Sequence, residues 1–81
     1  MKITINMKPH VVSKGTVLSE VVQTIRKSLG DDPVVQSLIA RTGGDHLTFV
    51  LNKRIVRGEK DLKIELKEGD DIRWMRPYAG G

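Results

Sequence analysis

At 81 residues, the chain is long enough for one small domain with a single core, and its 38% hydrophobic and 30% charged residues argue against disorder. It has no cysteine, and its two histidines are far apart, which excludes a disulfide framework, a thiolate nucleophile and a cysteine metal site; we expect no bound metal. The net charge of +4 permits a nucleic-acid partner, but the basic residues are scattered and three aromatic residues are too few for a base-stacking platform.

The chain is expected to open with a hairpin. Polar and β-branched apolar residues alternate over residues 2–7, which predicts a half-buried strand. Residues 8–10, which contain a proline, are predicted to turn the chain, and residues 11–12 to return as a short strand. This would place His10 in an exposed turn.

The strongest helical pattern follows the hairpin. Thr16 stands where an N-cap residue is expected, and Gly30 where a helix would end. The apolar residues between them recur at the spacing of one helical face: Leu18, Val21, Val22, Ile25 and Leu29. We therefore predict the main helix of the fold here.

A shorter helix is expected next, with Asp32 as its N-cap and Pro33 at its first position. A turn at residues 42–44 should end it. The glycine pair in that turn is not a phosphate-binding loop, because the lysine and Ser/Thr of that motif are missing. His46 is expected in the loop that follows.

The remaining segments are mostly extended. Residues 47–51 are apolar and β-prone, which predicts a central strand, and residues 52–54 should turn the chain into a short strand at 55–56. Alternating apolar residues over 62–66 predict either another extended segment or a loop packed on the core.

The final strand is predicted at residues 72–75, after a polar turn at 68–71. Alternation along this strand places Ile72 and Trp74 on the core face and Arg73 on the other face. Trp74 is therefore expected to pack in the core rather than to bind a ligand.

The last residues carry a functional signal. We expect residues 1–75 to form the domain and residues 76–81 an exposed, flexible tail, since Pro77 has no N–H for a sheet ladder. Six extended residues span about 20 Å, enough to enter a partner's active site. The carboxylate of Gly81 is unhindered, yet as an anion at neutral pH it needs activation, most simply as an acyl adenylate. Terminal glycines are also common at a frayed end, so the Gly-Gly end indicates a function only together with evidence from the rest of the chain.

The order of elements indicates the fold class. Placing the last strand beside the first, in parallel, lets the main helix bury its apolar face with a right-handed crossover. This is an α+β fold, the ubiquitin-like β-grasp, with a mixed sheet of four to five strands packed on one main helix plus a short second helix.

Several segments resemble the ubiquitin-like sulfur-carrier proteins ThiS and MoaD, with motifs closer to ThiS. They are residues 1–6 with residues 15–18, residues 51–56 (similar to an N-G-x-x-V turn), residues 66–72 (similar to L-x-x-G-D-x-[IV]) and residues 79–81. Each motif is weak alone, but their order and the Gly-Gly end are together specific.

The resemblance covers nearly the whole chain except residues 31–46, which are longer than in a typical ThiS and closer to MoaD in length. A second departure concerns two turns. Met7 and Lys53 stand where ThiS-like chains often have glycine after asparagine.

The resemblance implies a sulfur carrier rather than an enzyme. A ubiquitin-activating-type enzyme would adenylate Gly81 with ATP, a sulfur donor would convert it to a thiocarboxylate, and a cofactor synthase would take the sulfur. Thiamin thiazole is the favoured product and molybdopterin the next. The residues that would present the reacting group are Pro77, Tyr78, Ala79 and Gly80. The carrier would bind no cofactor itself and be a monomer when free.

Partner docking is a further expectation for Arg73 and Arg76, which form a local basic cluster, although a solvated strand edge explains them about as well. No apolar run approaches the ~20 residues of a membrane span, and no signal-peptide pattern opens the chain. We therefore expect a cytoplasmic protein without a membrane partner.

Two alternatives stay open. As in ubiquitin-like protein modifiers, the activated tail would be passed to lysines of target proteins, and the same Gly-Gly end serves both functions. A basic β-grasp module that binds RNA through Lys53, Arg54 and Arg57 would instead be indifferent to removal of Gly81.

Overall fold

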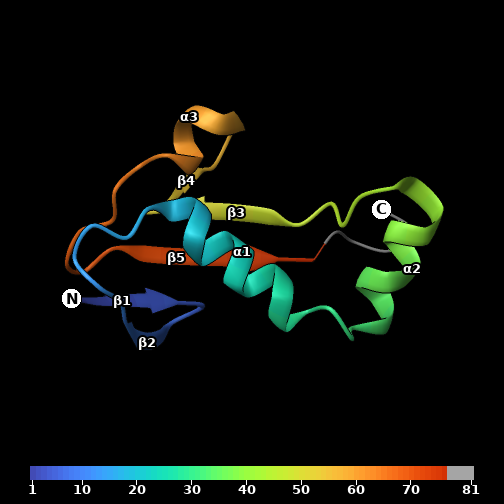
Figure 1. The fold of residues 1–81 in the computed structure, drawn as a ribbon, viewed down its shortest axis with the longest axis horizontal. Coiled ribbons are helices and arrows are strands. Elements are labelled where there is room, and N and C mark those ends of the chain that lie inside the picture. The colour runs from blue at the N-terminus through green and yellow to red at the C-terminus, as the bar shows by residue number, and fades with distance from the viewer. Residues whose placement is uncertain (77–81) are drawn as a thin grey trace.

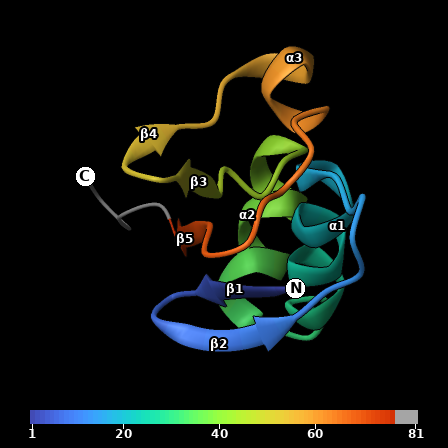
Figure 2. The ribbon, with the colours of Figure 1, turned by 90° about the vertical axis from the view of Figure 1, so that its left-hand side faces the viewer.

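The computed structural model describes residues 1–76; residues 77–81 lie outside the part described. In chain order the elements are β1 (Lys2–Ile5), β2 (Lys8–Val11), α1 (Leu18–Ser28), α2 (Pro33–Thr42), β3 (Thr48–Leu51), β4 (Arg54–Ile55), α3 (Gly58–Leu62) and β5 (Asp71–Met75). The strands form one mixed sheet in the order β2-β1-β5-β3-β4, in which β1 and β5 are parallel. α1 covers one face of this sheet (Figures 1 and 2). The predicted β-grasp arrangement is confirmed.

The core lies where α1 packs on the sheet. Every residue that the helical spacing assigned to the buried face is buried: Leu18, Val21, Val22, Ile25 and Leu29. They form one cluster with Ile3 of β1, Phe49 of β3 and Ile72 of β5. Burial of a large apolar side chain contributes about 1.5–3 kcal/mol, so this cluster is the main source of stability.

The start of α1 differs from the prediction by one residue. Val17 is the N-cap, and the Thr16 hydroxyl donates to the carbonyl of Ser13 at 2.7 Å instead of accepting from the helix. The carboxylate of Glu20 reaches back and accepts from the Val17 N–H at 2.8 Å. The helix start is therefore held by a carboxylate of the first turn that binds the N–H of the N-cap residue, and not by a hydroxyl that binds an N–H of the first turn.

The first hairpin turns earlier than predicted. Asn6 and Met7 form the turn, with φ of 48° and 70°, so both central residues are left-handed, as in the type I′ turn that joins paired strands. Residues 8–10 belong to β2, and His10 lies opposite Ile3 rather than in a turn. The proline was misleading because β2 is an edge strand. Pro9 occupies the pair next to the one that closes the turn, where no ladder N–H is needed.

The second hairpin repeats this geometry. Asn52 and Lys53 form its turn, with φ of 48° and 69°, and Arg54, predicted to belong to the turn, is the first residue of β4. Both turns thus have a non-glycine residue at the left-handed second position, where the sequence departs from the Asn-Gly pattern.

The segment between β4 and β5 contains a helix that the sequence did not predict. α3 is only five residues long, too short to show a helical periodicity. The Arg57 N–H at its start donates to the Asp61 carboxylate at 2.6 Å. Beyond α3 the chain packs on the core through Leu66, 3% exposed, and forms a single bridge between Glu65 and Val17. The packed-loop prediction is therefore confirmed for residues 63–66, whereas Leu62, which also packs against the core, belongs to α3.

The short second helix, α2, is confirmed. Asp32 is its N-cap, with one carboxylate oxygen accepting from the N–H groups of Val34 at 3.0 Å and Val35 at 3.2 Å. Gly43 ends the helix at φ 84°. Val35 is the one buried residue of α2, because the helix lies beyond the end of the sheet, on the side where β5 ends (Figure 1).

None of the helices within residues 1–76 is long and apolar enough to cross a membrane.

Candidate functional site

The reacting group predicted from the sequence lies outside the described residues. This applies to Gly81 and to the residues expected to present it: Pro77, Tyr78, Ala79 and Gly80. The structure describes the place from which they begin, which is the end of β5 and Arg76. The described part of the candidate site is therefore the set of contacts by which the domain holds that end.

β5 is the central strand of the sheet. It pairs with β1 on one side and β3 on the other, and Ile72 has no exposed surface. Trp74 lies on the same face as Ile72, opposite Phe49 of β3, and is half-buried against the core. The prediction that Trp74 is a packing residue is confirmed.

Asparagine side chains from both hairpin turns bond to β5. The Oδ1 of Asn6 accepts from the Trp74 N–H at 2.8 Å, which extends the β1–β5 ladder one step beyond the point where β1 turns away. The Oδ1 of Asn52 accepts from the Asp71 N–H at 2.8 Å, and its Nδ2 donates to the Asp70 carboxylate at 2.9 Å. The strand that leads into the tail is thus held by side chains near both of its ends.

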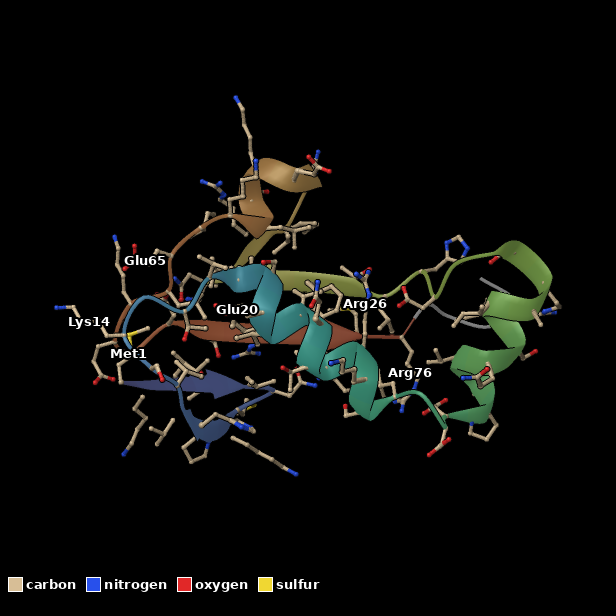
Figure 3. The ribbon with its side chains drawn as sticks, viewed as in Figure 1. Met1, Lys14, Glu20, Arg26, Glu65 and Arg76 are labelled. Carbon is tan, nitrogen blue, oxygen red and sulfur yellow. The ribbon has the colours of Figure 1, made fainter. Side chains whose placement is uncertain are left out.

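Arg76 follows the last residue of β5, and its side chain contacts the domain at two places. Its guanidinium donates through Nε and Nη2 to one carboxylate oxygen of Asp32, with the Nε bond at 3.2 Å. It also lies 5.3 Å from the centroid of the Trp74 ring, a cation–π distance. Figure 3 shows Arg76 between the end of β5 and the segment that enters α2. Hydrogen bonding from Arg76 lowers the pKa of Asp32 below its usual value, and the N–H groups at the start of α2 act in the same direction.

Arg73 lies on the open face of the sheet, and its partner is also within the domain. Its Nε donates to the Asp71 carboxylate at 3.1 Å, and the Thr4 hydroxyl donates to the other oxygen at 2.8 Å. The Thr4 hydrogen bond, followed by that from Arg73, lowers the pKa of Asp71 below its usual value. Both arginines proposed for partner docking are therefore bonded to carboxylates of the same chain.

The two histidines belong to different surroundings. His10 lies in β2, and the Nε2 of His46, in the loop after α2, is 2.8 Å from the Thr42 hydroxyl. Within residues 1–76, no group of three or more His, Asp or Glu side chains is arranged to hold a metal ion. A groove of about 400 Å³ lies between the first hairpin and α1 and is lined by mixed apolar and polar residues such as Ile5, Val12 and Thr24.

Comparisons with known proteins bear on the fold. Neither protein-family models nor curated proteins match this sequence. The crystal structure of the thiamine biosynthesis protein ThiS from Geobacter metallireducens matches over 100% of both chains, with a TM-score of 0.63 and 18% sequence identity.

The chain has the ThiS-type ubiquitin-like fold. The resemblance inferred from short motifs is thereby confirmed at the level of the fold. The parallel pairing of β1 with β5 and the position of α1 on the sheet are the features of this fold that the sequence predicted. Within this ThiS-type fold, sequence reasoning identified Arg73 and Arg76 but not their carboxylate partners. Asp32 was recognised as a helix cap, and its second role was hidden because Arg76 is 44 positions away.

Proposed function

We propose that the protein is a sulfur carrier that acts through the carboxylate of Gly81. The observation that carries the proposal is the ThiS-type fold over the whole chain, with the central strand β5 leading directly into the segment that contains Gly81. Because the matched protein is a thiamine biosynthesis protein, the favoured role is sulfur supply for the thiazole of thiamin, with molybdopterin next.

The chemistry takes place on one carbonyl carbon. A carboxylate oxygen of Gly81 attacks the α-phosphorus of ATP in a separate activating enzyme, and pyrophosphate leaves. Sulfide, the simplest sulfur donor, then attacks the carbonyl carbon, and AMP leaves with the bridging oxygen. The product is a thiocarboxylate, in which sulfur replaces one oxygen, and a cofactor synthase accepts that sulfur.

The chain's own residues supply presentation rather than catalysis. Glycine at positions 80 and 81 leaves the carbonyl free of neighbouring side chains, so a narrow active site can receive it. Pro77, Tyr78 and Ala79 would set the path of that segment into the partner. The protein would be a cosubstrate, with ATP bound by the activating enzyme.

The test is intact-mass analysis after incubation with a ubiquitin-activating-type adenylating enzyme, ATP and sulfide. The expected result is a mass increase equal to the replacement of one oxygen by sulfur. A variant that lacks Gly81 is the matched control and should show no increase.

The rival functions give different results in the same preparation. If Gly81 is found joined to lysines of other proteins and no thiocarboxylate is detected, the protein is a protein modifier and not a sulfur carrier. The RNA-binding alternative predicts salt-dependent RNA binding that is unchanged by loss of Gly81 and lost when Lys53, Arg54 and Arg57 are substituted together. That result would overturn both the sulfur-carrier and the protein-modifier functions.

A further inference from the structure

One carboxylate joins the beginning of α2 to the end of β5. The Oδ1 of Asp32 accepts from the N–H groups of Val34 and Val35, and its Oδ2 accepts from the guanidinium of Arg76. Asp32 therefore acts at two distant places in the sequence with different oxygens. The side chain of Asp32 is 16% exposed, so the pair is partly shielded from water.

Arg76 is the residue that most needs such a contact. The sheet ladder ends at Met75, so no strand pairing holds the backbone of Arg76. Its side chain reaches Asp32 on one side and the Trp74 ring on the other. Since Trp74 is half-buried and its N–H is bound by Asn6, both contacts of Arg76 are with groups that the domain holds in place.

We propose that Asp32 is a positioning residue, which fixes Arg76 and thereby the point from which residues 77–81 begin. The inference rests on the proposed function, because it assigns Asp32 a role in delivering Gly81 to a partner. If the starting point of a short segment is fixed before binding, less conformational entropy is lost when the partner takes up that segment. As a positioning residue, Asp32 acts through Arg76 and takes no part in the chemistry at the carbonyl.

The chain offers a closely matched control at the other end of α2. The Oδ1 of Asp45 accepts from the Leu47 N–H at 3.1 Å, and its Oδ2 accepts from Arg26 Nε at 2.9 Å. Arg26 lies 5.3 Å from the centroid of the Phe49 ring, the same distance that separates Arg76 from Trp74. Asp45 thus has the same three-part arrangement but makes no contact with Arg76. Figure 3 labels both arginines.

The variants are Asp32→Asn and Asp45→Asn. Asparagine caps a helix about as well as aspartate, as position 32 requires, and its side-chain oxygen can also accept from an N–H two residues on, as position 45 requires. Each variant therefore keeps its local backbone hydrogen bonds and loses the charge that attracts arginine. Their difference isolates the effect of releasing Arg76 from the general effect of losing an ion pair next to α2.

The first measurement needs only the free protein. Backbone ¹⁵N relaxation and the Nε–H signals of both arginines report how firmly each is held. We expect Asp32→Asn to lower the heteronuclear NOE of the Arg76 amide and shift its Nε–H signal, and Asp45→Asn to shift the signal of Arg26 alone. An unchanged Arg76 in Asp32→Asn would overturn the inference.

The second measurement is the steady-state activation of Gly81 by the adenylating enzyme. Asp32→Asn should raise KM about three- to tenfold and leave kcat unchanged, since the lost interaction orders the segment and does not touch the transition state. Asp45→Asn should leave both constants as in the wild type. An equal rise in both variants, or a fall in kcat alone, would show that Asp32 does not act by positioning. Wild-type protein that is not activated at all would refute the proposed function, and the relaxation data would still decide whether Asp32 holds Arg76.

Discussion

The two hairpins, β1–β2 and β3–β4, form opposite edges of the sheet and are bound to the same central strand (Figure 2). Their turns have nearly the same φ angles, yet their asparagines do not contribute equally. Asn52 makes two side-chain hydrogen bonds at the start of β5, whereas Asn6 makes one near its end. The hairpins therefore hold the start of β5 more firmly than the end from which the tail departs, and the ion pair between Asp32 and Arg76 reinforces that weaker end.

Removing the asparagine side chains tests this difference and should give the largest effects. Asn52→Gly loses two hydrogen bonds and should reduce the free energy of unfolding by about 2–3 kcal/mol, against about 1–2 kcal/mol for Asn6→Gly. Glycine accepts the left-handed φ of both positions, so turn strain does not enter the comparison. Urea denaturation followed by circular dichroism measures both. Equal losses would mean that β5 is held alike at its two ends.

How far these hairpins could be predicted from the sequence depended on whether the deciding contact was local. The stripe of α1, the cap at Asp32 and the two faces of β5 follow from spacing alone, and all three were predicted. The turn at Asn6 was missed because Pro9 is a turn signal only where a ladder N–H is required, and the edge position of β2 removes that requirement. Strand order across the sheet, which decides this, is not visible in a local pattern.

The candidate site shows the same division. The charges of Arg73 and Arg76 could be read from the sequence, but their partners Asp71 and Asp32 could not be assigned. Asp71 is only two residues from Arg73, yet its carboxylate is oriented by Thr4, which is 67 positions away. Tertiary contacts of this kind decide whether a surface charge is available to a partner.

The second position of each turn offers a smaller, opposite effect. Met7 and Lys53 have φ near 70° and are exposed, so replacing either with glycine removes a strained conformation without loss of packing. We expect Met7→Gly and Lys53→Gly each to raise the free energy of unfolding by about 0.5–1 kcal/mol. Val11→Gly, at an exposed extended position of β2, is the control and should lower it by about 0.5–1 kcal/mol. If both turn variants are less stable than the wild type, the side chains of Met7 and Lys53 contribute more to stability than the left-handed φ costs.

The smallest expected effect is on the pH dependence of stability. Both hairpins bind Asp71, but through different groups. Asn52 accepts from its backbone N–H, which does not titrate, whereas Thr4 of β1 donates to its carboxylate. The pKa of Asp71 is lowered in the folded protein, mainly by the Thr4 hydrogen bond, so this contribution to stability is complete above the unfolded pKa of about 3.9. It is lost as the pH falls through the lower folded pKa.

Thr4→Val keeps the β-branched shape and removes the hydroxyl, so the folded pKa of Asp71 should return towards its usual value. The loss of unfolding free energy between pH 7 and about pH 2.5 should therefore be smaller in Thr4→Val than in the wild type. In Asn6→Gly the same difference should match the wild type, because the bond removed there, from the Trp74 N–H to the Asn6 Oδ1, involves no titratable group. Arg73 also donates to Asp71, so part of the pH dependence should persist in Thr4→Val. Urea denaturation at the two pH values measures this difference. If Thr4→Val keeps the pH dependence of the wild type, the lowered pKa of Asp71 is due to Arg73 and not to the first hairpin.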